Sequence, residues 1–523
     1  MKFTLQNAFY LLLINCCVLC TNKIFSQREF TIEKKIARIR LSGETMFMED
    51  EANIGMIGIG YDLFGLIKKH PNVYLGVNSF SAMTGERAGI FSFGVSAGLK
   101  KRFFRTSLMY DLGVYVGGGG GGGAPDGGGL IVRPHFEFEQ RVSKGLSLRA
   151  GLAKIDFPTG TISSTHFSFG VTLDERFYQV KEKINNDLKS FSEFKLNEHR
   201  ISLVNTVYTS FQGDVVEDYN NTTYIPGENI ELIGIQFDKF FTKNFYGSLE
   251  FNGAYGGGVD GFMSYFIGGG MTLPILSNKL FYDLRFLAGP SGGGAVATGG
   301  GASFQIETGL GIQIFKEYQL KVLAGKTFAP SGTFEAFHYD FVFGKTFELF
   351  GGISNKTKTS FNLKTEGYKL QDFSFSVFNR TYFPPNLKDK NGIKYDHSFN
   401  LIGFEVAKRL TKNLSLAGST VWAYQGSYGA YGEGWLGVIG HQSLNKNWEI
   451  NAKLMAGAGG GGGIILGSGL LFQYTAGIER KLSEGISLFA NFGRFKPLEG
   501  NFNPIILDIG FKFNLSQLTF KSN

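Results

Sequence analysis

The chain has 523 residues, among them 74 glycines and 53 phenylalanines, with 18% charged residues and a formal net charge of +8. Glycine is about twice as common as the roughly 7% of average proteins, but the hydrophobic fraction of 43% and the 12 prolines exclude a disordered or collagen-like chain. Since no apolar run reaches the roughly 18 residues of a membrane-spanning helix, and no basic block suggests a nucleic-acid partner, a large all-β chain remains.

Residues 1–26 have the features of an export signal. Lys2 precedes an apolar stretch from Ala8 to Cys20, which is too short to cross a bilayer as a helix, and Ser26 is a small residue suited to signal peptidase. We therefore expect cleavage after Ser26. All three cysteines lie within this segment, so the mature chain would have neither disulfides nor thiol chemistry. The alternative is a lipoprotein anchored through one of these cysteines, although the residues before them are not the small ones that lipid attachment requires.

Three copies of one unit fill the rest of the chain. Tyr110-Asp111-Leu112 recurs as Tyr282-Asp283-Leu284, and the glycine block from 117 to 129 recurs at 289 to 301 with the same offset. A third glycine block occupies 457 to 469. We therefore expect three domains, at 27–185, 186–355 and 356–523.

Within each copy, apolar residues occur at every second position. Phe167 and Phe169 alternate with Ser168 and Gly170 in the first copy, for example, and this period predicts strands with one apolar face and one polar or small face. About eight strands are expected in each copy, and about 24 in all. In the second copy they are expected near 199–212, 229–241, 245–255, 262–275, 280–289, 300–315, 318–328 and 334–350.

Short and long connections alternate along the chain. Thr242-Lys243-Asn244 and Lys316-Glu317 are tight turns, whereas 213–228 and 384–397 are long and polar. Together with the export signal and a last strand rich in phenylalanine, this pattern resembles the Gram-negative outer-membrane β-barrel proteins, with a porin-like architecture. The resemblance implies an antiparallel transmembrane barrel in contact with outer-membrane lipid, with the short turns in the periplasm. It brings no active-site motif, and a secreted soluble sandwich is the alternative.

The sequence leaves open whether the copies form one barrel or three. Eight strands can close a small barrel filled by its own side chains, whereas 24 would enclose a wide lumen. The segments on either side of Ser354-Asn355-Lys356-Thr357 could pair as one long hairpin that fuses neighbouring copies, so a single large barrel is favoured over three small ones. Such a barrel has no residues left for an internal plug and would need a protein partner to close it.

Charged residues of both signs fall on the inward face of the predicted strands. They either pair to stabilise the barrel interior or line a path for a solute. Nothing at matched spacing forms a catalytic pair, and the equivalent positions His166 and His338 are matched by Ile506 in the third copy, so we expect no enzyme activity, cofactor or metal. The lumen-facing candidates are Asp111, Arg133, His135, Glu137, Asp283, Arg285, Glu307, Glu449, Lys453 and Glu479.

The glycine blocks contain the spacing of a dinucleotide-binding loop only because nearly every residue in them is glycine. They lack the helix and the distal acid that such a site needs. Each block is instead predicted to join the fifth and sixth strands of its copy as a hairpin, and a strip without side chains allows another segment to approach closely. We expect these strips to be contact surfaces, either for a partner or for tight closure, at Gly119, Gly121, Gly293 and Gly461.

Two functions are compatible with these features. The sequence favours a pore or translocation channel with a partner that plugs or gates it. The alternative is a structural or assembly protein with closed barrels, in which the glycine strips are docking faces.

Overall fold

The computed structural model describes residues 30–48, 51–66, 69–182, 196–211, 216–217, 223–224, 229–276, 279–350, 368–384, 388, 392, 397–483 and 485–520. The expected export signal lies outside these residues. In the part of the chain that is described, the fold is all-β with antiparallel pairing, and no helix has the length and apolar character needed to cross a membrane.

The strands group into three sets in chain order. The first set is β1 (Phe30–Met46), β2 (Ile54–Phe64), β3 (Val73–Thr84), β4 (Phe91–Arg102), β5 (Leu108–Gly120), β6 (Leu130–Ser143), β7 (Leu146–Asp156) and β8 (Ser163–Glu182). The second is β9 (Leu196–Phe211), β12 (Ile230–Phe240), β13 (Phe245–Gly256), β14 (Met263–Leu276), β15 (Leu280–Gly292), β16 (Ala302–Phe315), β17 (Tyr318–Phe328) and β18 (Glu335–Phe350), with the short β10 (Val216–Glu217) and β11 (Thr223–Tyr224) between β9 and β12. The third is β19 (Tyr368–Phe383), β20 (Phe399–Thr411), β21 (Leu414–Gln425), β22 (Gly432–Ser443), β23 (Trp448–Gly460), β24 (Leu470–Ser483), β25 (Ile486–Pro497) and β26 (Ile505–Phe520).

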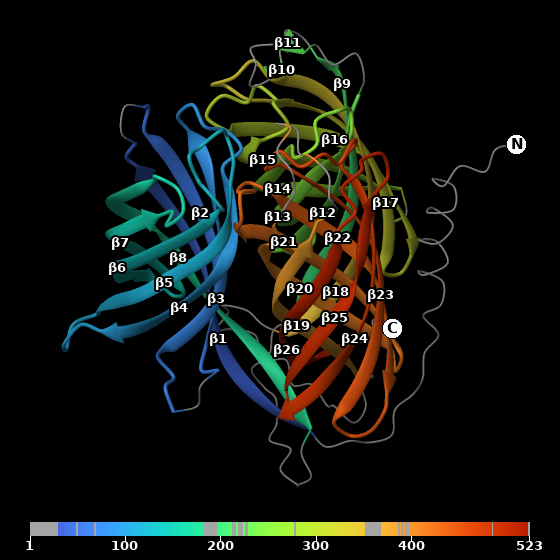
Figure 1. Cartoon of the computed structure of the whole chain (residues 1–523). Coiled ribbons are helices and arrows are strands. Elements are labelled where there is room, and N and C mark those ends of the chain that lie inside the picture. Colours follow the sequence, from blue (N-terminus) through green and yellow to red (C-terminus); the bar gives the residue numbers. More distant parts are fainter. Residues whose placement is uncertain are drawn as a thin grey trace, which may run out of the picture.

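Each set closes on its own first strand and forms an eight-stranded barrel. β8 pairs with β1, β18 with β9, and β26 with β19, each over more than ten residues. Barrels 1 and 3 share one further backbone pair, between Ser516 and Val180. Figure 1 shows barrel 1 in blue and teal beside barrel 3 in orange and red, with barrel 2 in green and yellow.

The predicted antiparallel β-barrel architecture with about 24 strands in three repeats is confirmed, and of the two closures left open the chain has three small barrels. The favoured single large barrel does not form, because β18 pairs with β17 and β9, whereas β19 pairs with β20 and β26. The proposed hairpin between the second and third copies is therefore also wrong. Closure within a copy brings eight inward faces near enough for their side chains to meet and fill the interior.

The strand positions expected from alternation agree with the structure to within a few residues. In the second copy the expected strand at 318–328 is β17 (Tyr318–Phe328), and that at 334–350 is β18 (Glu335–Phe350). The glycine blocks join the fifth and sixth strands of each barrel, as predicted, through hairpins at 121–129, 293–301 and 461–469. We call these the glycine hairpins.

The two faces of each strand have opposite chemistry. On β8, Phe167 and Phe169 are 76% and 65% exposed, whereas His166 and Ser168 between them are buried. On β18, Tyr339 is likewise half exposed beside buried neighbours. Because side chains alternate between the two faces of a strand, the apolar residues cover the outside of each barrel and the polar residues fill its interior.

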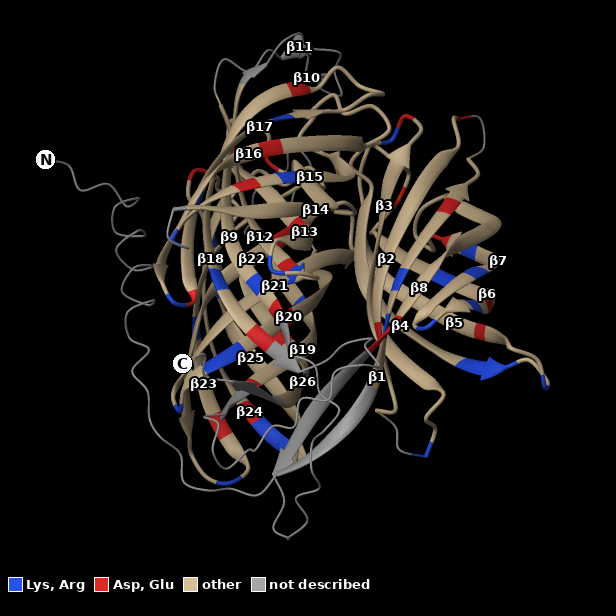
Figure 2. Ribbon diagram, turned by 180° about the vertical axis from the view of Figure 1, so that it is seen from behind, with Lys and Arg blue, Asp and Glu red and all other residues tan. Residues whose placement is uncertain are grey.

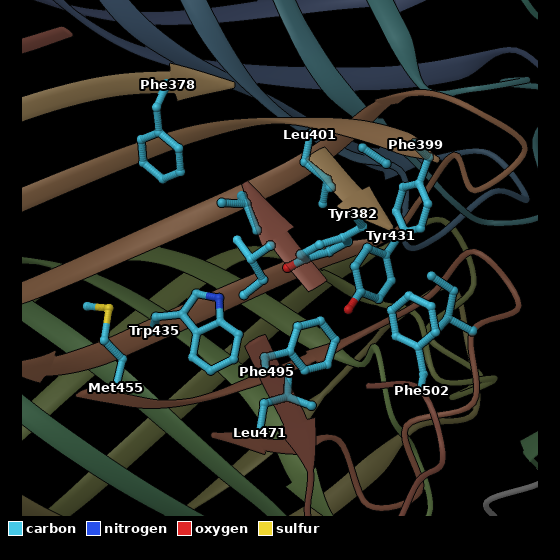
Figure 3. Packing of buried hydrophobic residues seen from close by; sticks show 14 of the residues in the cluster. Phe378, Tyr382, Phe399, Leu401, Tyr431, Trp435, Met455, Leu471, Phe495 and Phe502 are labelled. Atoms are coloured by element: carbon cyan, nitrogen blue, oxygen red, sulfur yellow. The ribbon is translucent and has the colours of Figure 1, made fainter. Parts of the chain in front are cut away.

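A cluster of apolar side chains closes each barrel at the end that carries the glycine hairpin. In barrel 3, Figure 3 shows Tyr382, Tyr431, Phe495 and Phe502 packed together, and all four are fully buried. Corresponding clusters lie in barrels 1 and 2. The barrel 1 cluster includes Met46, Phe80, Tyr115 and Phe157, and the barrel 2 cluster includes Tyr208, Leu232, Phe262 and Phe334. We call these clusters the apolar caps. Alternation predicts polar or small residues along the whole inward face, so the apolar caps depart from that prediction.

Candidate functional site: barrel interiors and glycine hairpins

The predicted inward-facing residues of barrel 1 are all buried and all lie in ion-pair networks. Asp111 accepts hydrogen bonds from Arg38 (2.6 Å) and from the Tyr74 hydroxyl (2.8 Å), and His135 Nε2 lies 3.4 Å from the Asp111 carboxylate. Arg133 donates to both oxygens of Glu44 and also contacts Glu137 at 3.4 Å. These side chains lie inside barrel 1, where ion pairs neutralise their charges.

Barrel 2 is built around one arginine. Arg285 donates to Glu250 (2.7 Å), Glu307 (2.7 Å) and Asp340 (2.9 Å), so it holds three carboxylates at once. Asp283 accepts a hydrogen bond of 2.7 Å from the Tyr246 hydroxyl. The predicted residues of this copy thus converge on the centre of the barrel.

In barrel 3 the predicted residues form separate pairs. Glu449 accepts from Arg409 at 3.2 Å and lies 2.8 Å from a ring nitrogen of His441. Lys453 donates to Glu405 at 2.6 Å, and Lys512 donates to Glu479 at 2.7 Å. In Figure 2 basic and acidic positions are interspersed along the barrel strands, as such pairing requires.

The first strand of each barrel carries a buried arginine that is not among the predicted lumen-facing residues. Arg38, Arg200 and Arg380 are among the largest fully buried side chains, and they pair with Asp62 (2.8 Å), Asp238 (2.6 Å) and Asp508 (2.8 Å) respectively. The alternation that identified the other candidates also places these arginines inward. Removing one member of such a buried pair costs roughly 3–5 kcal/mol, because the other charge is left without a partner.

The glycine hairpins are the places where the barrels touch. The β3–β4 loop of barrel 1 packs against the glycine hairpin of barrel 2, where the Ala88 amide donates to the Gly299 carbonyl at 3.2 Å. A Cβ atom added to Gly89 would lie 2.6 Å from the backbone nitrogen of Gly293, and one added to Gly300 would lie 2.6 Å from Thr84 Cα. Side chains at these positions would therefore force the two barrels apart.

The same contact recurs between the other barrels. A Cβ atom on Gly261, in the β13–β14 loop of barrel 2, would lie 2.9 Å from the Gly461 nitrogen in barrel 3. Barrel 3 in turn contacts barrel 1, since a Cβ atom on Gly128 of the glycine hairpin would lie 2.6 Å from the Gly426 carbonyl oxygen. The Ala430 amide also donates to the Gly119 carbonyl, next to the hairpin, at 3.4 Å. Each barrel thus places one loop on the glycine hairpin of the next, and three such head-to-tail contacts close into a ring.

All four predicted contact glycines also pack tightly inside their own barrels, and a Cβ atom on Gly119 would collide with the Phe91 carbonyl oxygen. A Cβ atom on Gly121, Gly293 or Gly461 would collide with the carbonyl oxygen of Gly89, Gly261 or Ala430, the equivalent residue of its own barrel. All three residues in that second position have positive φ, of 88°, 88° and 69°. The hairpins are therefore close-packed within each barrel as well as between neighbours.

Aromatic residues from all three barrels meet next to these hairpins. Phe91, Tyr265 and Trp422 form one buried cluster, with ring centroids 5.0 Å apart for Phe91 and Tyr265 and 6.4 Å apart for Tyr265 and Trp422. Each ring comes from a different barrel. Contacts of this kind add roughly 0.5–1.5 kcal/mol each beyond the area that they bury.

Asp126 lies in the glycine hairpin of barrel 1, against barrel 3. Its carboxylate accepts a hydrogen bond of 2.8 Å from the Gly121 amide, and a Cβ atom added to Gly429 would lie 2.5 Å from its Oδ1. Burial raises the pKa of Asp126 to about 6.

No protein family and no curated protein matches the chain. Among solved structures it is similar to OccK11 of Pseudomonas aeruginosa (10% identity, 93% of this chain and 96% of that one, TM-score 0.22). It is also similar to the outer membrane protein OpdK of the same organism (10%, 93% and 99%, 0.21) and to the siderophore receptor PirA of Acinetobacter baumannii (10%, 94% and 81%, 0.26). At these TM-scores the similarity carries no information on function. A proposal about function therefore rests on the geometry of the barrel interiors and the glycine hairpins.

Proposed function

We propose that this chain is an integral protein of the outer membrane of a Gram-negative bacterium, exported through a cleaved signal at 1–26. One observation carries the proposal: closed barrels expose phenylalanine, leucine and isoleucine on their outer faces, as at Phe286 (51%) and Phe511 (49%). A sheet in hydrocarbon must satisfy all its backbone groups, and a closed barrel does so without an edge. Recovery of the protein in the soluble fraction after carbonate extraction of host membranes would refute the proposal.

Within the membrane, the geometry best supports a structural or assembly role. In the described residues, the apolar caps and the paired charges fill each barrel interior, and the aromatic cluster of Phe91, Tyr265 and Trp422 fills the place where the three barrels meet. The glycine hairpins supply the docking surfaces, and they join the barrels to one another. Purified protein in planar bilayers should therefore give no stable single-channel current.

Transport through a pore or translocation channel is the second candidate. The observation in its favour is the layer of charge of both signs beneath each cap, which would be the lining of a path if the cap were displaced. Such a path would need a gating partner to displace the caps, because the apolar caps block the barrel interiors. Large, stable currents from the purified protein, alone or with such a partner, would favour this role and contradict the structural one.

A further inference from the structure

Three buried side chains at the centre of barrel 2 point their donor atoms toward one another. A carboxylate oxygen of Glu307, a ring nitrogen of His338 and a carboxylate oxygen of Asp340 all lie within 4.8 Å of each other. All three residues are at most 1% exposed. They belong to two strands, β16 and β18, so the closed barrel brings them together.

The second carboxylate oxygen of each acid is already held in place. Arg285 donates through Nε to Oε2 of Glu307 and through Nη2 to Oδ2 of Asp340. Asp340 Oδ1 has no hydrogen-bond donor in good geometry, and Glu307 Oε1 accepts from Gln305. A carboxylate that binds a metal through one oxygen is commonly oriented by a hydrogen bond to the other, so Arg285 is in the position of such an orienting group.

The hydrogen bonds around His338 fix its tautomer. The Thr327 hydroxyl donates its hydrogen to Gln305 Oε1 at 3.0 Å, so at its 3.2 Å contact with His338 Nδ1 it must accept. His338 Nδ1 therefore carries the proton, and Nε2 presents a lone pair. That Nε2 has no hydrogen-bond partner and lies 4.0 Å from Glu307 Oε1. A buried lone pair facing a carboxylate is unfavourable unless a cation or a proton lies between them.

The interior of barrel 2 also has more acidic than basic groups. Among its described residues, five carboxylates that are at most 1% exposed face only three buried cations, Arg200, Arg285 and Lys321. The carboxylates are Asp238, Glu250, Asp283, Glu307 and Asp340. In barrel 1, four buried arginines and the partly buried Lys100 face six buried carboxylates, among them Asp126 of the glycine hairpin, so the excess there is one negative charge. The two excess negative charges of barrel 2 equal the charge of one divalent cation.

The equivalent positions in the other barrels lack this arrangement. In barrel 1 the corresponding His166 is satisfied at both ring nitrogens, by Glu44 at 3.0 Å and Ser164 at 3.4 Å. In barrel 3 the corresponding residue is Ile506, and the nearby Asp508 has Arg380 as its partner. The open donor set is therefore a feature of barrel 2 alone among the described residues.

We propose that Glu307, His338 and Asp340 bind one divalent transition-metal ion, such as Zn²⁺, in the interior of barrel 2. Imidazole nitrogen and carboxylate oxygen bind Zn²⁺ at roughly 2.0–2.2 Å, so small side-chain rotations would bring all three donors onto one ion. The ion neutralises the excess charge and has a structural role. The sequence-based expectation that the chain binds no metal rested on histidines from different copies. It did not include a histidine and two carboxylates from one copy.

The metal content of the purified full chain tests this proposal. Protein isolated in detergent from cells grown with zinc should contain about one equivalent of first-row divalent metal per chain by mass spectrometry. The His338→Ala variant should lose that metal, whereas the matched His166→Ala variant in barrel 1 should keep it. Metal-free wild-type protein, or metal retained by His338→Ala, would overturn the proposal and indicate that a proton is shared among these groups.

A second measurement covers the case in which His338→Ala does not fold. The wild-type protein produced with Co²⁺ should show visible absorption bands of a low-symmetry cobalt site, and Asp340→Asn, which keeps the side-chain volume, should change or abolish them. Absence of these bands in the wild type would contradict the site. The conductance and extraction experiments are independent of this one, because a closed membrane barrel is compatible with either result.

Discussion

The contact between barrels 1 and 2 gives the most direct test of the glycine hairpins. A Cβ atom on Gly300 would lie 2.6 Å from Thr84 Cα, whereas carbon atoms pack at roughly 3.5–4.0 Å, so a side chain must push the barrels apart by about 1 Å. Overpacking of this kind costs roughly 1–3 kcal/mol. The Gly300→Val variant should therefore open the hydrogen bond between the Ala88 amide and the Gly299 carbonyl more often, accelerating hydrogen exchange at Ala88 by about 5- to 150-fold.

Two references make this experiment specific. Gly434 has nothing within 4 Å of its Cβ position, so Gly434→Val should leave exchange at Ala88 unchanged. The Ala82 amide bonds to Ile90 inside barrel 1 and should exchange at the same rate in Gly300→Val as in the wild type. Normal protection of Ala88 in Gly300→Val would refute the packing argument, and equal acceleration at Ala82 would indicate unfolding of the barrel rather than separation of two barrels.

Three further predictions follow from the barrel interior, the hairpin and the outer face. Replacing Arg380 by Met should destabilise barrel 3 by roughly 3–5 kcal/mol in a urea titration, and adding Asp508→Leu should restore most of that loss; a double variant no more stable than the single one would contradict this. The pKa of Asp126 in the folded chain is about 6 and exceeds its unfolded value of roughly 3.9. The stabilising contribution of Asp126 is therefore complete below pH 4 and is lost as the pH rises through 6. The unfolding midpoint of the wild type, relative to that of Asp126→Asn, should fall over that range and level off above it. The Phe167→Arg variant should lose roughly 2–4 kcal/mol of folding free energy in lipid vesicles, and an unchanged value would argue against lipid contact at this face.

Alternation was sufficient to place the strands and to choose the inward residues. Arg285 and Glu307 were assigned to the interior from their register alone, and they lie there 2.7 Å apart. Since every residue on one face of a strand shares one environment, an eleven-residue strand such as β17 carries the same signal several times. The first-strand arginines were overlooked although they carry the same signal.

The apolar caps could not be inferred in this way. Tyr382 and Phe495 lie on the same inward faces as Arg380 and the other charged residues. In the sequence, an apolar residue at an alternating position is equally compatible with the lipid-facing side of the strand, so the alternation does not identify the members of the caps. These side chains are buried because of their position along the barrel axis. That position is defined only by the register between neighbouring strands. The partners of the glycine hairpins were likewise unknown, because a glycine does not encode what packs against it.

The sequence by itself determined the three repeats, the strands, the two faces of each strand and the hairpin position of each glycine block. Those features depend on spacing along the chain, which is local. Only the tertiary structure decided that each copy closes on its own first strand, that the charges neutralise one another across each barrel, and that the three barrels form a ring through their glycine hairpins. The last strand of a copy can pair with the first strand of its own copy or with that of the next copy. Both pairings are compatible with the same alternation of apolar and polar residues. The difference lies in whether the inward side chains can meet, and that depends on the width of the closed barrel.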